Sequence, residues 1–78
     1  MNTVSLNMII EINKILEGKN LNYKVHLKDA CGCQSMWIEA LNNQTITDEV
    51  YQIISEYFKG ERMKLEFNSS DTGFRVVD

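Results

Sequence analysis

The amino-acid sequence predicts an α+β fold in which two helices cover one face of a four-stranded antiparallel sheet, in the order αββαββ. Two observations lead to this prediction. Two segments place apolar residues at helical spacing, and four shorter segments alternate between apolar and polar residues, as strands with one buried face do. The chain has 78 residues, which is the size of one small domain, so we treat residues 1–78 as a single domain.

The first helix is expected over residues 5–17, where apolar side chains recur every three or four residues: Met8, Ile9, Ile12, Ile15 and Leu16. Ser5 is suited to cap the start of this helix, and Gly18 to end it. The second helix should begin after a cap at Thr47 and end at Gly60. Its apolar stripe consists of Val50, Ile53, Ile54 and Tyr57.

Strands are expected over residues 22–28, 36–41, 63–67 and 74–77. Their apolar positions form the face beneath the helices: Tyr23, Val25, Leu27, Met36, Ile38, Met63, Leu65, Phe67, Phe74 and Val76. The positions between them form an open face: Lys24, His26, Lys28, Trp37, Glu39, Lys64, Glu66, Arg75 and Val77. A register shifted by one residue would exchange the two faces and bury Trp37.

The two halves of the chain resemble each other. In each half a helix ends at a glycine, and a strand with the same alternation follows. An internal duplication of a helix–hairpin unit would explain the similarity, and so would independent use of the same helix stops and strand pattern.

The composition excludes several classes of partner. The net charge is −3 and the pI is about 5.0, whereas binding to nucleic acid requires a basic surface. No apolar segment approaches the roughly 20 residues that span a bilayer, and the first residues do not match a signal peptide. We therefore expect a cytoplasmic protein with reduced thiols and neither a nucleic-acid nor a membrane partner.

Both cysteines, Cys31 and Cys33, lie in a predicted loop over residues 28–35. A pair this close can act in thiol redox chemistry, or can bind zinc, another soft metal or an iron–sulfur cluster with His26 as a third ligand. Three ligands do not complete a tetrahedral structural site. The remaining interpretation is a turn in which the cysteines are small structural residues. It requires no cofactor, and it is the one we favour.

Binding is a better expectation than catalysis, because the chain has one histidine and lacks the usual catalytic motifs. The candidate binding residues combine the loop with the open face: Lys28, Asp29, Cys31, Gln34, Trp37 and His26. An exposed tryptophan on a sheet face is typical of a contact surface for a protein or small molecule. The competing interpretation places Trp37 along the aliphatic stems of lysine and arginine side chains. A homodimer through this face is a further alternative.

The loop sequence from Lys28 to Gly32, followed by Gln34 and the segment 37–39, resembles a group of short bacterial proteins, largely from anaerobes, called the RDAC family after its Arg-Asp-Ala-Cys motif. Lys28 stands where the motif has arginine, which keeps the charge but loses the bidentate geometry. The resemblance implies no particular activity. It implies that Cys31 matters more than Cys33, because the motif contains the first cysteine alone.

Overall fold

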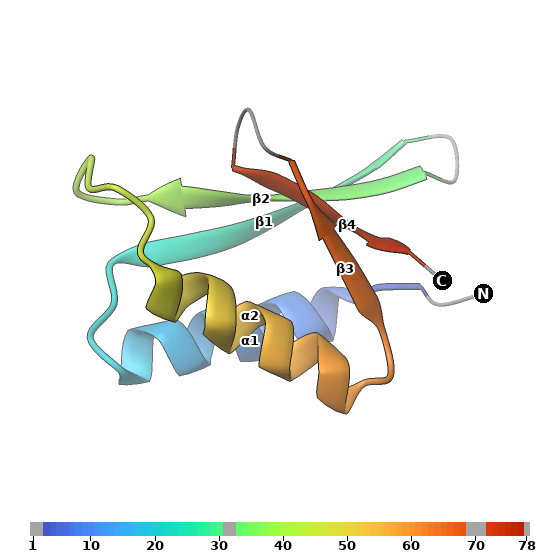
Figure 1. Cartoon of the computed structure of the whole chain (residues 1–78), viewed down its shortest axis with the longest axis horizontal. Coiled ribbons are helices and arrows are strands. Elements are labelled where there is room, and N and C mark those ends of the chain that lie inside the picture. Colours follow the sequence, from blue (N-terminus) through green and yellow to red (C-terminus); the bar gives the residue numbers. More distant parts are fainter. Residues whose placement is uncertain (1–2, 31–32, 69–71, 78) are drawn as a thin grey trace.

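The computed structural model describes residues 3–30, 33–68 and 72–77. The elements follow one another as helix α1 (Leu6–Gly18), strand β1 (Tyr23–Ala30), strand β2 (Cys33–Ala40), helix α2 (Asp48–Gly60), strand β3 (Lys64–Phe67) and strand β4 (Gly73–Val77). This is the predicted order αββαββ, and both helices lie on the same side of the sheet (Figure 1). The predicted fold class is confirmed.

The sheet is antiparallel and has the strand order β1-β2-β4-β3. Two hairpins therefore meet through their second strands, and Figure 1 shows them crossing at an angle. In the described residues, the register between β2 and β4 comprises two pairs, Met36 with Phe74 and Trp37 with Gly73. We call these two pairs the seam between the hairpins.

The alternation along each strand assigns the two faces of the sheet as predicted. Val25, Met36, Ile38 and Phe74 are at most 2% exposed, whereas Trp37 is 40% exposed. A register shifted by one residue is therefore excluded. An antiparallel sheet that packs helices on one face leaves the other face to solvent, which explains why the pattern identified the register.

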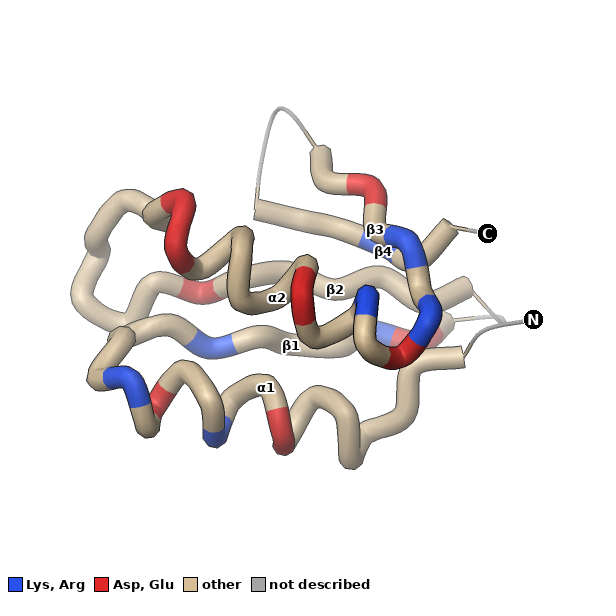
Figure 2. Tube along the Cα trace, turned by 60° about the horizontal axis from the view of Figure 1, so that its bottom comes forward, with Lys and Arg blue, Asp and Glu red and all other residues tan. Residues whose placement is uncertain are grey.

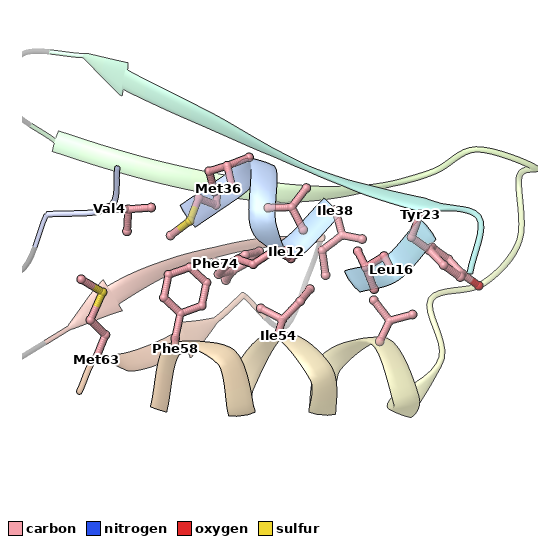
Figure 3. Packing of buried hydrophobic residues seen from close by; sticks show 13 residues of the cluster. Val4, Ile12, Leu16, Tyr23, Met36, Ile38, Ile54, Phe58, Met63 and Phe74 are labelled. Carbon is pink, nitrogen blue, oxygen red and sulfur yellow. The ribbon is translucent and has the colours of Figure 1, made fainter. Parts of the chain in front are cut away.

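The core fills the space between the helices and the sheet (Figure 3). Each helix contributes fully buried side chains, notably Ile12 and Leu16 from α1 and Ile54 and Phe58 from α2. Phe58 meets Phe74 of the sheet edge-on, with 6.2 Å between the ring centroids. Burying a side chain of this size stabilises the fold by about 2 kcal/mol, so these residues hold the two layers together.

The two helices start differently but end alike. Ser5 caps α1 as predicted, because its Oγ accepts a hydrogen bond from the Met8 amide. Thr47 occupies the cap position of α2, but its side chain makes no capping bond, so that prediction was wrong in detail. Both helices have 13 residues, and neither is long and apolar enough to cross a membrane, as far as the described residues extend.

The first hairpin is longer than the sequence predicted. Strands were expected to stop at residue 28 and resume at 36, but β1 continues to Ala30 and β2 begins at Cys33. Asp29 pairs with Gln34, and Ala30 with Cys33. The ladder continues through residues of low strand propensity because that propensity is small and depends on context. Most of the predicted loop 28–35 is therefore strand.

Candidate functional site

The open face of the sheet carries an aromatic stack on its two longest strands. His26 of β1 and Trp37 of β2 are register partners. Their rings stack with 5.0 Å between centroids and 21° between planes. The stack exists because the alternation places both residues on the side away from the helices, directly opposite each other. Trp37 thus packs on His26.

A carboxylate fixes the imidazole of this stack. The Nε2 atom of His26 lies 2.8 Å from Oε1 of Glu39, the next open-face residue of β2. An ionised carboxylate only accepts hydrogen bonds, so Nε2 carries the proton and donates it. In the neutral imidazole, Nδ1 is then an acceptor. The His26 side chain remains 30% exposed, so the stack presents both an apolar indole and a polar ring to solvent.

A groove of about 360 Å³ adjoins Trp37 on the side of β4. Gly73 is the register partner of Trp37 on that strand and contributes no side chain there. The groove is also lined by polar groups, including Ser35, Thr72 and Arg75. The indole therefore has His26 on one side and this groove on the other, an arrangement suited to receiving an apolar or planar group.

The charges of the open face differ from those of the whole chain. Four of the eight basic residues lie there, whereas the described part of the face has two acidic residues. Both acidic residues are engaged, since Glu39 binds His26 and Glu66 binds Arg75 at 2.8 Å. In the described part of the chain, three lysines of the face have no such partner: Lys24, Lys28 and Lys64. The face is basic on a chain of net charge −3.

The structure separates the predicted binding residues into two groups. His26, Lys28 and Trp37 lie together on the open face, as β1 and β2 alternate. Asp29 and Gln34 are register partners on the helix side. The Gln34 amide accepts from the Val4 amide and donates to the Val4 carbonyl, both at 2.8 Å, so this side chain anchors the segment before α1.

The structure describes one of the two cysteines. Cys31 lies outside the described residues, whereas Cys33 is an exposed, free thiol. Cys33 pairs with Ala30, and His26 lies four residues earlier on β1. Four strand residues span about 13 Å, too far for His26 and Cys33 to bind one metal ion. No cluster of three or more metal-binding side chains occurs among the residues that the structure describes.

Sequence reasoning missed two polar contacts that position the site. The Asn13 amide of α1 binds the backbone of Val25 on β1, accepting from its N–H at 2.8 Å and donating to its C=O at 3.1 Å. Tyr57 of α2 donates to Glu11 of α1 at 2.5 Å. Nothing in the sequence identifies Val25 as the partner of Asn13 or Glu11 as the partner of Tyr57.

Comparison of the chain with protein-family models, with curated proteins and with solved structures found no match. The site is therefore interpreted from its own residues.

Proposed function

We propose that this chain is a non-catalytic binding module that contacts its partner through the open sheet face. The observation that supports the proposal most strongly is the exposed Trp37, held by His26 beside a groove. A large aromatic side chain fixed by its neighbours binds with little loss of conformational entropy, which is why such residues dominate contact surfaces. Lys28, at the edge of the same face, adds a positive charge near the stack.

The partner that this surface suits is a protein or a small molecule. Nucleic acid remains an unsuitable partner, because two acidic residues interrupt the basic positions and the chain is acidic as a whole. A cytoplasmic location, a relation to the RDAC family and a homodimer through the open face belong to the same proposal. Sedimentation at high concentration tests the homodimer, which a purely monomeric chain would exclude.

A screen by nuclear magnetic resonance tests the binding proposal. A library of small aromatic and peptide ligands is titrated into the wild-type chain, into Trp37→Ala and into Leu41→Ala. Leu41 is the matched control, because it is a large apolar residue, 54% exposed, that lies beyond the end of β2 and does not line the groove beside Trp37. We expect ligands that shift the resonances of His26 and Trp37 in the wild type, lose at least tenfold in affinity in Trp37→Ala and bind Leu41→Ala normally.

Ligands that bind elsewhere, or that bind Trp37→Ala as well as the wild type, would contradict the proposal. The thermal midpoints of both variants serve as the folding control. Trp37 is outside the core, so its truncation should leave the fold intact.

The second candidate is thiol redox or soft-metal chemistry at Cys31 and Cys33. The observation in its favour is the exposed thiol of Cys33 on the same face as Trp37. It predicts a disulfide, a bound metal or an unusually reactive thiol in freshly purified protein. Thiol titration, mass spectrometry and elemental analysis measure these directly. Two free thiols of ordinary reactivity without bound metal would exclude this candidate.

A further inference from the structure

β1 is an edge strand of the sheet, and one side chain covers part of its free edge. The sheet order leaves β1 with β2 as its one neighbour. On the other side, Asn13 of α1 binds both the N–H and the C=O of Val25. Side-chain bonding of this kind reproduces the pair of bonds that another strand would make. Asn13 therefore closes the edge at a single residue.

The edge beyond Val25 is not closed in this way. Peptide groups along an antiparallel strand point alternately to either side, so the N–H and C=O groups of Leu27 and Asp29 point in the same direction as those of Val25. No backbone or side-chain bond to these groups occurs among the described residues. We call residues 26–30 the open edge. An exposed edge of this kind is a template for strand addition.

The side chains around the open edge differ on its two sides. Lys28 and His26 point to the open face, whereas Leu27 points to the helix side. On α1, Leu6 and Ile10 lie on the same stripe as Asn13 and are 67% and 44% exposed. Figure 2 shows α1 running alongside β1, which packs against it. A strand added here would meet the positive charge of Lys28 on the open face, and on the helix side Leu27, the exposed apolar residues of α1 and the carboxylate of Asp29.

A second copy of the chain does not fit this edge. In a two-fold antiparallel pairing, the register centred on residue 28 places Lys28 opposite its own copy, and that centred on residue 29 does the same with Asp29. Like charges directly opposite each other are destabilising. The register centred on Leu27 requires the backbone groups of Val25, which Asn13 already binds. The edge is thus protected against self-pairing.

We propose that the open edge of β1 accepts an extended segment of another protein, in which acidic residues alternate with apolar ones. The residue opposite Lys28 lies on the open face and carries a carboxylate. Its neighbours are apolar and point to the helix side, against Leu27, the exposed residues of α1 and Asp29, whose carboxylate disfavours a second acidic residue there. This inference rests on the proposed binding function and names the partner, since such a segment also borders the His26–Trp37 stack.

The test uses two short synthetic peptides, one in which glutamate alternates with valine and one in which lysine replaces glutamate. Asp29→Pro removes an outward N–H of the open edge, and proline is tolerated on edge strands at such positions. Asp29→Ala is the matched control, because it removes the same carboxylate and keeps the N–H. Affinities are measured by calorimetry, and amide hydrogen exchange locates the contact.

We expect the glutamate peptide to bind, to slow exchange of the Leu27 and Asp29 amides and to leave the Val25 amide unchanged. Asp29→Pro should weaken binding by roughly tenfold, whereas Asp29→Ala should bind at least as well as the wild type. The lysine peptide should bind much more weakly. Exchange measured in wild-type protein keeps the test decisive if Asp29→Pro fails to fold.

The outcomes distinguish this inference from the proposed function. Equal binding by Asp29→Pro and Asp29→Ala, with sensitivity to Trp37→Ala, would overturn strand addition and leave open-face binding intact. Sensitivity to Asp29→Pro without any effect of Trp37→Ala would support strand addition and contradict open-face binding. No binding of the glutamate peptide, or equal binding of the lysine peptide, would overturn the inference.

Discussion

Single amide side chains do much of the positioning in this small domain. Asn13 ties α1 to the edge of β1, and Gln34 ties the segment before α1 to β2. Both use one donor and one acceptor on a single backbone residue, so neither leaves a polar group unsatisfied at a partly buried site. Such bonds fix the position of the helix relative to the strand that carries His26.

Tyr57 gives the stability of the domain a predictable dependence on alkaline pH. Burial, the hydrogen bond to Glu11 and the negative charges of Glu11 and Glu61 together raise the pKa of its hydroxyl from 10.0 to about 12, with burial the largest cause. The folded state thus holds this proton more tightly than the unfolded state does. The resulting stability is present below pH 10 and is lost as the pH rises from 10 to about 12.

We expect Tyr57→Phe to lower the free energy of unfolding by about 1 kcal/mol at neutral pH, because the variant loses the hydrogen bond to Glu11. This difference should vanish as the pH rises through 10 to about 12. Denaturant unfolding at several pH values measures it. Glu11→Gln is the control, since it should bring the tyrosine titration, followed by phenolate absorbance, to lower pH. If the two free energies of unfolding differed by the same amount at every pH, the raised pKa of Tyr57 would not be the source of the pH dependence.

At the scale of elements, both helices end with the same backbone motif. After α1, Asn20 adopts the left-handed conformation with φ 58°, and the Leu21 amide donates to the Leu16 carbonyl. After α2, Arg62 has φ 61°, and the Met63 amide donates to the Phe58 carbonyl. These are Schellman motifs, and their left-handed position lies two residues after each glycine.

The glycines at the helix ends are therefore not required by the backbone. Gly18 and Gly60 are the last helical residues, and a Cβ atom at either would meet no atom within 4 Å. We expect Gly18→Ala and Gly60→Ala to stabilise the chain by about 0.5–1 kcal/mol each, as alanine favours the helix. Asn20→Ala should have the opposite sign, because its φ is positive. Thermal unfolding measures all three, and destabilisation by Gly18→Ala would refute the reasoning.

The sequence predicted these elements well where one physical rule governs many residues. Alternation along β1 and β2 identified the register and exposed Trp37, because a sheet covered on one side repeats the same choice at every position. It did not predict the length of the first hairpin, since Asp29, Cys33 and Gln34 have no strong strand preference. It named Gln34 as a binding residue rather than as an anchor for Val4, and it missed the bonds of Asn13. In both cases the partner is a backbone group distant in sequence, and every residue offers the same backbone groups.

At the scale of the whole molecule, two similar halves share one core. Each half consists of a helix with a Schellman end followed by a hairpin, and the hairpins meet at the seam. Among the described residues, the seam has two register pairs and one further backbone bond, from the Ile38 amide to the Thr72 carbonyl. Buried side chains from both halves add to the contact between them. The similarity between the halves that the sequence indicates thus has a structural counterpart.

The segment before α1 adds to this shared core, which leads to a prediction about coupling. Val4 is 3% exposed, and its backbone is held by Gln34. Gln34→Ala should cost about 2 kcal/mol in the free energy of unfolding, because two part-buried hydrogen bonds are lost. Val4→Ala should cost about 1 kcal/mol more in the wild type than in Gln34→Ala, since the segment is already loosened there. Additive effects in this double-mutant cycle would show that Gln34 does not anchor Val4.

The seam also determines what the tryptophan fluorescence of the chain reports. The protein has one tryptophan, and that residue is half of a seam pair, Trp37 with Gly73. Its ring is partly exposed to solvent and stacks on the imidazole of His26. The wavelength and intensity of its fluorescence will therefore change when the hairpins separate or when a ligand covers the indole. Trp37 is therefore an intrinsic fluorescent probe that lies both at the seam between the two halves and on the proposed contact surface.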